Sequence, residues 1–349
     1  MPQHSSIKVD IPNKPELSPG LRIVFMGTPD FAVPSLIALV KAGCPPIAVV
    51  TGADKPRGRG QKFSPTAVKK AAMDLGIEDI LQPENVKDPI FATQIADLKA
   101  DIIVVVAFRI LPSSVFEAAR LGTFNLHGSL LPRYRGAAPI NRAIMGGDTQ
   151  TGVTTFLLQQ KVDTGNVLLK KAMSIGENET AGEVHDRMMI LGAEAVVDTV
   201  KILSSGSIEA TPQDNSLATP APKIFKDDAL INWSESAQHI HNQVRGMSPY
   251  PGAFTFLNGV QLKILRTSVF VREEEGDLES QVSSTKSVPN PILHSGEIVE
   301  SRGTIRVVCG NGMIEIHAVQ LAGKRAMPTA DFLRGNPVAV STVLGLGES

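Results

Sequence analysis

The sequence is poor in cysteine and lacks long apolar runs. Its 349 residues include only two cysteines, Cys44 and Cys309, far apart in the chain. Two such thiols cannot form a disulfide framework, and this low cysteine usage favours a reducing compartment, so we expect a cytoplasmic protein. No uninterrupted apolar stretch reaches the ~18 residues that a membrane-spanning helix needs. These absences argue against a disulfide-rich secreted scaffold and against a membrane-embedded protein.

Metal-ligand and dinucleotide-binding patterns are also missing. No group of His, Cys, Asp and Glu has the spacing of a metal site, so we predict no metal. Gly27-Thr28-Pro29-Asp30 follows an apolar run, as in a nucleotide-binding unit, but the G-x-G-x-x-G fingerprint is absent. This argues against a nicotinamide-dependent oxidoreductase. The formal net charge of −1 gives no overall attraction to nucleic acid, so any RNA binding must come from local patches.

Strand and helix signals alternate from residue 21 to about residue 205. Short apolar runs at 21–26 (LRIVFM) and 101–107 (DIIVVVA) predict buried strands, and a further strand is expected at 47–51. The alternation predicts a doubly wound, mostly parallel α/β sheet for residues 21–205. Residues 1–20 have no apolar core and are expected to form a disordered leader.

The second part of the chain has another pattern. Residues 206–222 are rich in Ser, Thr, Pro, Gln and Asn, which predicts an interdomain linker. Short alternating strands follow, and Asn258-Gly259 between two of them indicates a type I′ hairpin. Five or so such strands predict a small β-barrel of the OB type within residues 223–349. An acidic, Ser-rich loop at 272–290 interrupts it and is expected to be disordered.

The clearest signal for a functional site is the end of a predicted strand, Thr-Phe-Asn-Leu-His at 123–127. Asn125 and His127 are two residues apart on this strand, so their side chains point to the same face. An amide donor and a titratable imidazole at the carboxyl end of a strand are typical of active sites in open α/β sheets. An ordinary strand-to-helix loop with a buried histidine fits these residue types equally well.

A carboxylate further along the chain strengthens the active-site interpretation. Asp163 lies in a Val-Asp-Thr-Gly turn after a predicted strand at 152–158. From such a turn the carboxylate can meet His127 across the crevice of the sheet. Taken alone, a simple turn whose carboxylate binds its own backbone is the plainer explanation.

A short basic segment precedes the helix that follows the strand at 47–51. Residues 54–62 (DKPRGRGQK) contain four cations, two glycines and no apolar residue, so they cannot pack as core. A solvated surface loop would explain this composition. A mobile basic finger that binds phosphates would explain it too.

Together these motifs resemble the folate-dependent formyltransferases. The resemblance extends from about Leu21 to about Val338. It implies a Rossmann-like formyltransferase domain followed by an OB-like, tRNA-binding domain. It also implies transfer of a formyl group from 10-formyltetrahydrofolate to the methionine amino group of initiator methionyl-tRNA, for translation initiation. The motifs in chain order are Asn125-x-His127, Ser129-Leu130-Leu131-Pro132, Arg135-Gly136, Pro139-Ile140 and Asp163-Thr164-Gly165.

The resemblance also implies roles for individual residues. Asn125 would donate to the negative oxygen of a tetrahedral intermediate, and His127 would donate a second bond or shuttle a proton. Asp163 would orient His127 and help take the proton of the amine. A monomer without an obligate protein partner is expected. Folate contacts are expected from Ser129, Leu130, Leu131, Pro132, Phe108 and Arg109, and tRNA contacts from Lys55, Arg57, Arg59 and Lys62, with Arg59 the foremost.

One stretch departs from the family pattern. The family often reads V-V-V-A-Y-G-x-x-L-P after the central strand, whereas residues 104–112 read VVVAFRILP, one residue shorter. We therefore expect a different turn at Phe108 and Arg109, with Arg109 able to reach the pterin pocket.

Other functions share parts of this pattern. A sugar nucleotide, another small amine such as glycinamide ribonucleotide, or water could replace tRNA as acceptor, but the basic segment and the β domain favour tRNA. A nicotinamide-dependent oxidoreductase lacks its glycine fingerprint here. A noncatalytic RNA-binding module would leave Asn125, His127 and Asp163 unexplained.

Overall fold

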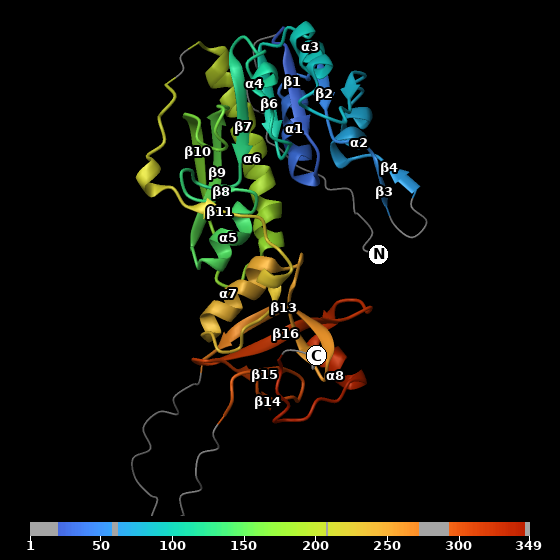
Figure 1. Ribbon diagram of the computed structural model, residues 1–349, viewed down its shortest axis with the longest axis vertical. Coiled ribbons are helices and arrows are strands. Elements are labelled where there is room, and N and C mark those ends of the chain that lie inside the picture. Colours follow the sequence, from blue (N-terminus) through green and yellow to red (C-terminus); the bar gives the residue numbers. More distant parts are fainter. Residues whose placement is uncertain (1–19, 58–61, 207–208, 272–292, 346–349) are drawn as a thin grey trace, which may run out of the picture. The chain divides into compact units, whose positions relative to one another are not determined.

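The structure is a computed structural model that describes residues 20–57, 62–206, 209–271 and 293–345. The chain divides into two compact units (Figure 1). The first contains residues up to 140 together with 150–175 and 183–223, and the second contains 141–149, 176–182 and everything from 224 onward. Residues 1–19 of the predicted leader and the whole predicted loop at 272–290 lie outside the described residues.

The first unit is built on a seven-stranded sheet with the order β10-β9-β7-β6-β1-β2-β5. The five neighbouring strands β7, β6, β1, β2 and β5 run parallel to one another. In contrast, β9 is antiparallel to β7 and β10 is antiparallel to β9. The predicted doubly wound, mostly parallel sheet is therefore confirmed. The strands are β1 (Ile23–Gly27), β2 (Ala48–Val50), β5 (Ile80–Leu81), β6 (Ile102–Val106), β7 (Gly122–His127), β9 (Gln150–Leu157) and β10 (Val167–Ser174).

Helices cover both faces of this sheet. On one face, apolar residues of α3 (Pro89–Asp97) and α4 (Ser113–Phe116) share a core with alternate residues of β1, β2 and β6. On the other, α6 (Ala181–Ser204) comes so close that Gly192 lies against Leu126 of β7. Every residue of β1 and β6 is buried, which explains their unbroken apolar sequences. The first unit also contains α1 (Val33–Lys41) and α2 (Ala67–Asp74), whereas α5 (Pro139–Met145) begins in the first unit and ends in the second.

The second unit contains an antiparallel sheet with the order β12-β13-β16-β15-β14, and β17 (Met327–Pro328) pairs with β16. Its hairpin turn has positive φ at both Asn258 (49°) and Gly259 (76°), as the predicted type I′ turn requires. The end of the described chain bridges both edges, because Gly345 pairs with Phe256 and Val343 with Glu297. This closure fits the predicted small barrel. The other elements are α7 (Ala237–Met247), β12 (Ala253–Leu257), β13 (Val260–Phe270), β14 (Ile298–Glu300), β15 (Ile305–Val308), β16 (Met313–Leu321) and α8 (Thr329–Gly335).

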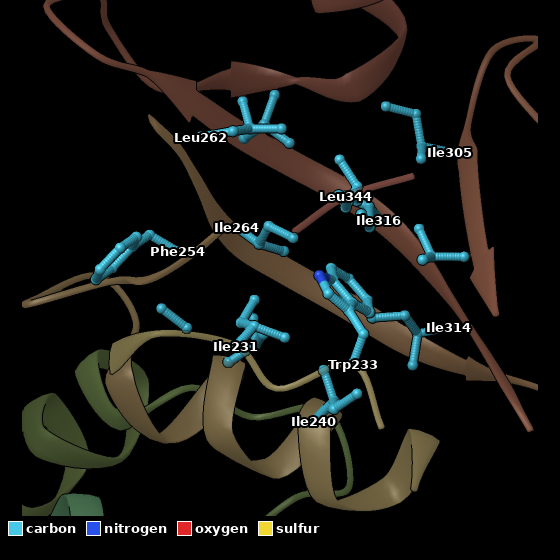
Figure 2. Packing of buried hydrophobic residues seen from close by; sticks show 14 of the residues in the cluster. Ile231, Trp233, Ile240, Phe254, Leu262, Ile264, Ile305, Ile314, Ile316 and Leu344 are labelled. Atoms are coloured by element: carbon cyan, nitrogen blue, oxygen red, sulfur yellow. The ribbon is translucent and has the colours of Figure 1, made fainter. Parts of the chain in front are cut away.

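The core of the second unit is arranged around Trp233, the only tryptophan of the chain (Figure 2). Its ring is 5% exposed and packs with Ile240 of α7 and Ile314 of β16 in one apolar cluster. The indole Nε1 donates a hydrogen bond to Thr255 Oγ1 at 3.0 Å, and Thr255 is fully buried. This bond satisfies a polar group that the core would otherwise leave unpaired.

Replacing Thr255 with Val keeps the shape of the side chain but removes the acceptor. The free energy of unfolding of the second unit should fall by about 1–3 kcal/mol, because a buried N–H then lacks a partner. Urea unfolding followed by the fluorescence of Trp233 measures this directly. Thr255→Ser, which keeps the hydroxyl, should lose less, and a Val variant as stable as the natural chain would refute this role of the hydrogen bond.

Candidate active site

The strand β7 presents Asn125 and His127 on one face of the sheet. It lies between β6 and β9, where Asn125 is opposite Val105 and His127 is opposite Thr154. Asn125 is partly exposed, and its side chain makes no hydrogen bond to another residue in the described ranges. The amide is therefore free to bind a substrate group. His127, in contrast, is only 6% exposed.

The position of the His127 ring is set by a backbone carbonyl. Its Nε2 lies 2.8 Å from the carbonyl oxygen of Tyr134. A carbonyl can only accept, so this contact assigns the hydrogen to Nε2. In the neutral ring Nδ1 then carries the lone pair and can accept a proton.

Asp163 faces this second ring nitrogen. Its Oδ2 is 3.8 Å from His127 Nδ1 and accepts a hydrogen bond from the backbone N–H of Gly136 at 2.9 Å. The 3.8 Å separation is too long for a hydrogen bond, but it is short enough for the carboxylate to stabilise a positive charge on the ring. The structure thus brings His127 and Asp163 together, with the side chains only 7% and 12% exposed.

The segment from Ser129 to Pro132 forms a turn. It turns back on itself, because Ser129 Oγ donates to the carbonyl of Arg133 at 2.6 Å. Thr154 Oγ1 lies between the Ser129 carbonyl (2.7 Å) and the Leu131 N–H (3.0 Å), and Leu131 is fully buried. Of the predicted folate-binding segment, Leu130 and Pro132 remain partly exposed.

The turn that departs from the family pattern has its own conformation. Ala107 has a φ of +48°, in the left-handed region, after which Phe108 and Arg109 are both partly buried. The Arg109 guanidinium donates to the carbonyls of Glu84 (2.8 Å) and Pro83 (2.7 Å), and it lies 5.2 Å from the centre of the Phe108 ring. Burial lowers the pKa of Arg109. The guanidinium therefore binds the loop after β5.

The basic segment begins and ends in a short hairpin. Strands β3 (Lys55–Arg57) and β4 (Lys62–Ser64) pair antiparallel, and Lys55 is exposed. Arg59, together with the side chains of Arg57 and Lys62, lies outside what the structure describes. Asp54 anchors the base of the hairpin through an ion pair with Lys69 at 2.7 Å. Hydrogen bonds from Lys69 and Gln82 hold the pKa of Asp54 below its usual value.

The predicted linker makes hydrogen bonds to the candidate site that the sequence did not indicate. Within 209–222, β11 (Pro220–Ala221) pairs with β8 (Arg135–Gly136), and Thr219 Oγ1 accepts from the Tyr134 N–H at 2.9 Å. Gln213 binds both Arg135 and the turn that carries Asp163. The polar composition that suggested a linker carries no signal for these contacts.

Neither a metal-binding cluster nor a membrane-spanning helix appears in the described residues. No three His, Cys, Asp or Glu side chains come together there in a way that could hold a metal ion. None of the helices described is long and apolar enough to cross a membrane.

Similar proteins identify the family. Residues 21–200 match the formyl transferase family and residues 223–337 match the formyl transferase C-terminal domain family. The methionyl-tRNA formyltransferase of Chlorobium luteolum is 46% identical over 90% of this chain and 96% of its own length. That of Geobacter sulfurreducens is 44% identical over 93% of this chain and 97% of its own length.

Solved structures of lower identity share the fold. One is an N-formyltransferase from Helicobacter canadensis in complex with folinic acid and dTDP-3-aminofucose, with a TM-score of 0.61 and 18% identity over 85% of this chain and 98% of that chain. Another is HypX from Aquifex aeolicus in complex with tetrahydrofolic acid, with a TM-score of 0.59 and 17% identity over 90% of this chain and 47% of that chain. Because two formyl transferase families cover both parts of the chain and relatives above 40% identity span nearly all of it, the chain belongs to the methionyl-tRNA formyltransferase family.

Proposed function

We propose that this chain transfers the formyl group of 10-formyltetrahydrofolate to the α-amino group of methionine on initiator tRNA. One observation carries the proposal: a free amide at Asn125 lies on the same strand face as the His127–Asp163 pair, which can accept a proton. Formyl transfer to an amine needs both functions. Relatives named methionyl-tRNA formyltransferase, 43–46% identical, support tRNA as the acceptor.

The transfer begins when the amine attacks the formyl carbon. The carbonyl oxygen becomes negative in the tetrahedral intermediate, and the Asn125 amide donates a hydrogen bond to it. One such donor is typically worth about 3 kcal/mol of the barrier. The lack of a hydrogen bond from this amide to another described residue supports the role, because a donor already bonded within the protein would first have to break that bond.

The proton of the attacking amine passes to His127. Since Nε2 already donates to the Tyr134 carbonyl, Nδ1 is the nitrogen that accepts it. Asp163 stabilises the resulting imidazolium, because its carboxylate lies 3.8 Å away. When the C–N bond to the folate breaks, the imidazolium returns the proton to the folate nitrogen N10. The amine becomes an amide, tetrahydrofolate leaves, and His127 is again neutral.

The folate contacts are proposed for the segment beside this group. Leu130 and Pro132 are partly exposed and can contact the pterin or the formyl-bearing part, whereas Ser129 and Leu131 would act through their backbone. Phe108 offers a partly exposed ring to the same ligand. Arg109 would reach it only by giving up its bonds to the carbonyls of Pro83 and Glu84.

A sugar nucleotide is the main alternative acceptor, because sugar N-formyltransferases share the fold. The basic segment 54–62, with Lys55, Arg57, Arg59 and Lys62, favours tRNA, since clustered cations beside glycines suit phosphates. We further propose that the chain acts in the cytoplasm and as a monomer. Its two cysteines are both buried thiols, which agrees with a reducing compartment.

Asn125→Ala tests the oxyanion role. The catalytic rate should fall about a hundredfold or more, while folate affinity changes little, because the lost bond forms only when the oxygen becomes negative. Single-turnover kinetics and a folate titration of the same variant separate the two effects. An unchanged rate would remove Asn125 from the chemistry.

The acceptor is tested with charged tRNA and with variants of the basic hairpin. The natural chain should formylate initiator methionyl-tRNA far better than charged elongator tRNA, with 10-formyltetrahydrofolate as donor. Arg59→Gln should lower kcat/KM for initiator tRNA by a factor equivalent to about 1–3 kcal/mol. Lys62→Gln should reduce the slope of log affinity for tRNA against log salt concentration by about one. Lys99→Gln is the control, because this exposed lysine precedes the amino end of β6, whereas the hairpin follows the carboxyl end of the parallel strand β2.

Folate binding should survive all three substitutions, since the hairpin and β7 are separate elements. If the hairpin variants lost activity equally toward tRNA and toward a small amine acceptor, the hairpin would only support the fold. Equal use of initiator and elongator tRNA would contradict the proposed substrate.

A further inference from the structure

Gln213 holds three groups around the active site at once. Its Nε2 donates to the carbonyls of Asp163 (3.0 Å) and Gly165 (2.8 Å). Its Oε1 accepts from Nε (3.1 Å) and Nη2 (2.7 Å) of Arg135. Both amide hydrogens and the amide oxygen are therefore engaged, which fixes the side chain in one orientation.

The turn that Gln213 holds contains a residue with a left-handed backbone conformation and makes a close approach to β9. Asp163 has a φ of +54°, in the left-handed region that residues with a Cβ seldom adopt. Gly165 lies so close to β9 that a Cβ there would be 1.6 Å from the Leu157 carbonyl oxygen. A residue outside the turn that binds two of its carbonyls stabilises this conformation.

Gln213 also acts on the segment that binds the Asp163 carboxylate. Asp163 Oδ2 accepts from the Gly136 N–H, and Gly136 directly follows Arg135. Gly136 has a φ of +130° and packs against the carbonyl of Ala221. One side chain thus fixes the backbone of Asp163 and the neighbour of its hydrogen-bond donor.

We propose that Gln213 is a positioning residue that keeps the Asp163 carboxylate opposite His127 Nδ1. Its described hydrogen bonds go to neither the ring nor the carboxylate but to the Asp163–Gly165 turn and Arg135, through which it acts. Its effect on formyl transfer rests on the proposed function, whereas its effect on the geometry does not. A shift of about 1 Å in a catalytic group can lower a rate by up to ~100-fold.

The kinetic test compares Gln213→Leu and Gln213→Glu with Asn215→Ala. Glu keeps the size and the acceptor for Arg135, but it places an oxygen against the two carbonyls. Asn215 Oδ1 also accepts from Arg135 Nη2, at 2.9 Å, yet no hydrogen bond joins its side chain to the described Asp163 turn. Both Gln213 variants should lower kcat at least ~10-fold while KM for 10-formyltetrahydrofolate changes less than ~3-fold. Asn215→Ala should change kcat less than ~2-fold.

A second readout is independent of activity. The Gly136 N–H donates to Asp163 Oδ2, so NMR hydrogen exchange at Gly136 reports whether the carboxylate is in place. Exchange should be at least ~10-fold faster in Gln213→Glu and unchanged in Asn215→Ala. Unchanged Gly136 exchange in the Gln213 variants, or an equal loss of kcat in Asn215→Ala, would overturn the proposal. If the natural chain formylates no tRNA, the proposed function fails, while Gly136 exchange still decides the positioning role.

Discussion

The hydrogen bond between His127 Nε2 and the Tyr134 carbonyl determines what the active site can do. It places the hydrogen on Nε2, so the lone pair is on Nδ1, which faces Asp163 at 3.8 Å. The carbonyl reaches the ring because the chain folds back after the turn at Ser129–Pro132, with positive φ at Tyr134 (61°) and Gly136 (130°). In the proposed transfer, a backbone group, rather than a side chain, therefore decides which nitrogen of His127 would take the proton of the amine.

The sheet supplies the remaining geometry. Strand β7 carries Asn125 and His127 on one face, and the antiparallel β9 returns beside it. Thr154 of β9 fixes the Ser129–Leu131 turn, while the chain beyond β9 brings Asp163 back to His127. The proposed oxyanion donor and the proposed proton acceptor thus belong to a single strand, which would keep their mutual position constant during the transfer.

Residue patterns predicted the parts of the structure that depend on local physics. The apolar run of β6, the alternation of β7 and the Asn258-Gly259 hairpin follow from burial, pleat and turn chemistry. The Tyr134 carbonyl carries no side-chain signal, and Gln213 lies in a polar stretch that resembles an ordinary linker. The bent loop at Ser129 and the inward bonds of Arg109 depend on distant partners, Thr154 and Pro83, which no local pattern identifies.

The state of the His127 ring tests this account most directly. NMR of the chain with ¹⁵N-labelled histidine distinguishes the two neutral tautomers, with His127→Gln identifying the signals. We predict a protonated Nε2 and an unprotonated Nδ1 in the neutral ring, because the Tyr134 carbonyl can only accept. A neutral ring with its hydrogen on Nδ1 would leave no acceptor facing Asp163, and it would contradict the proposed route of the proton.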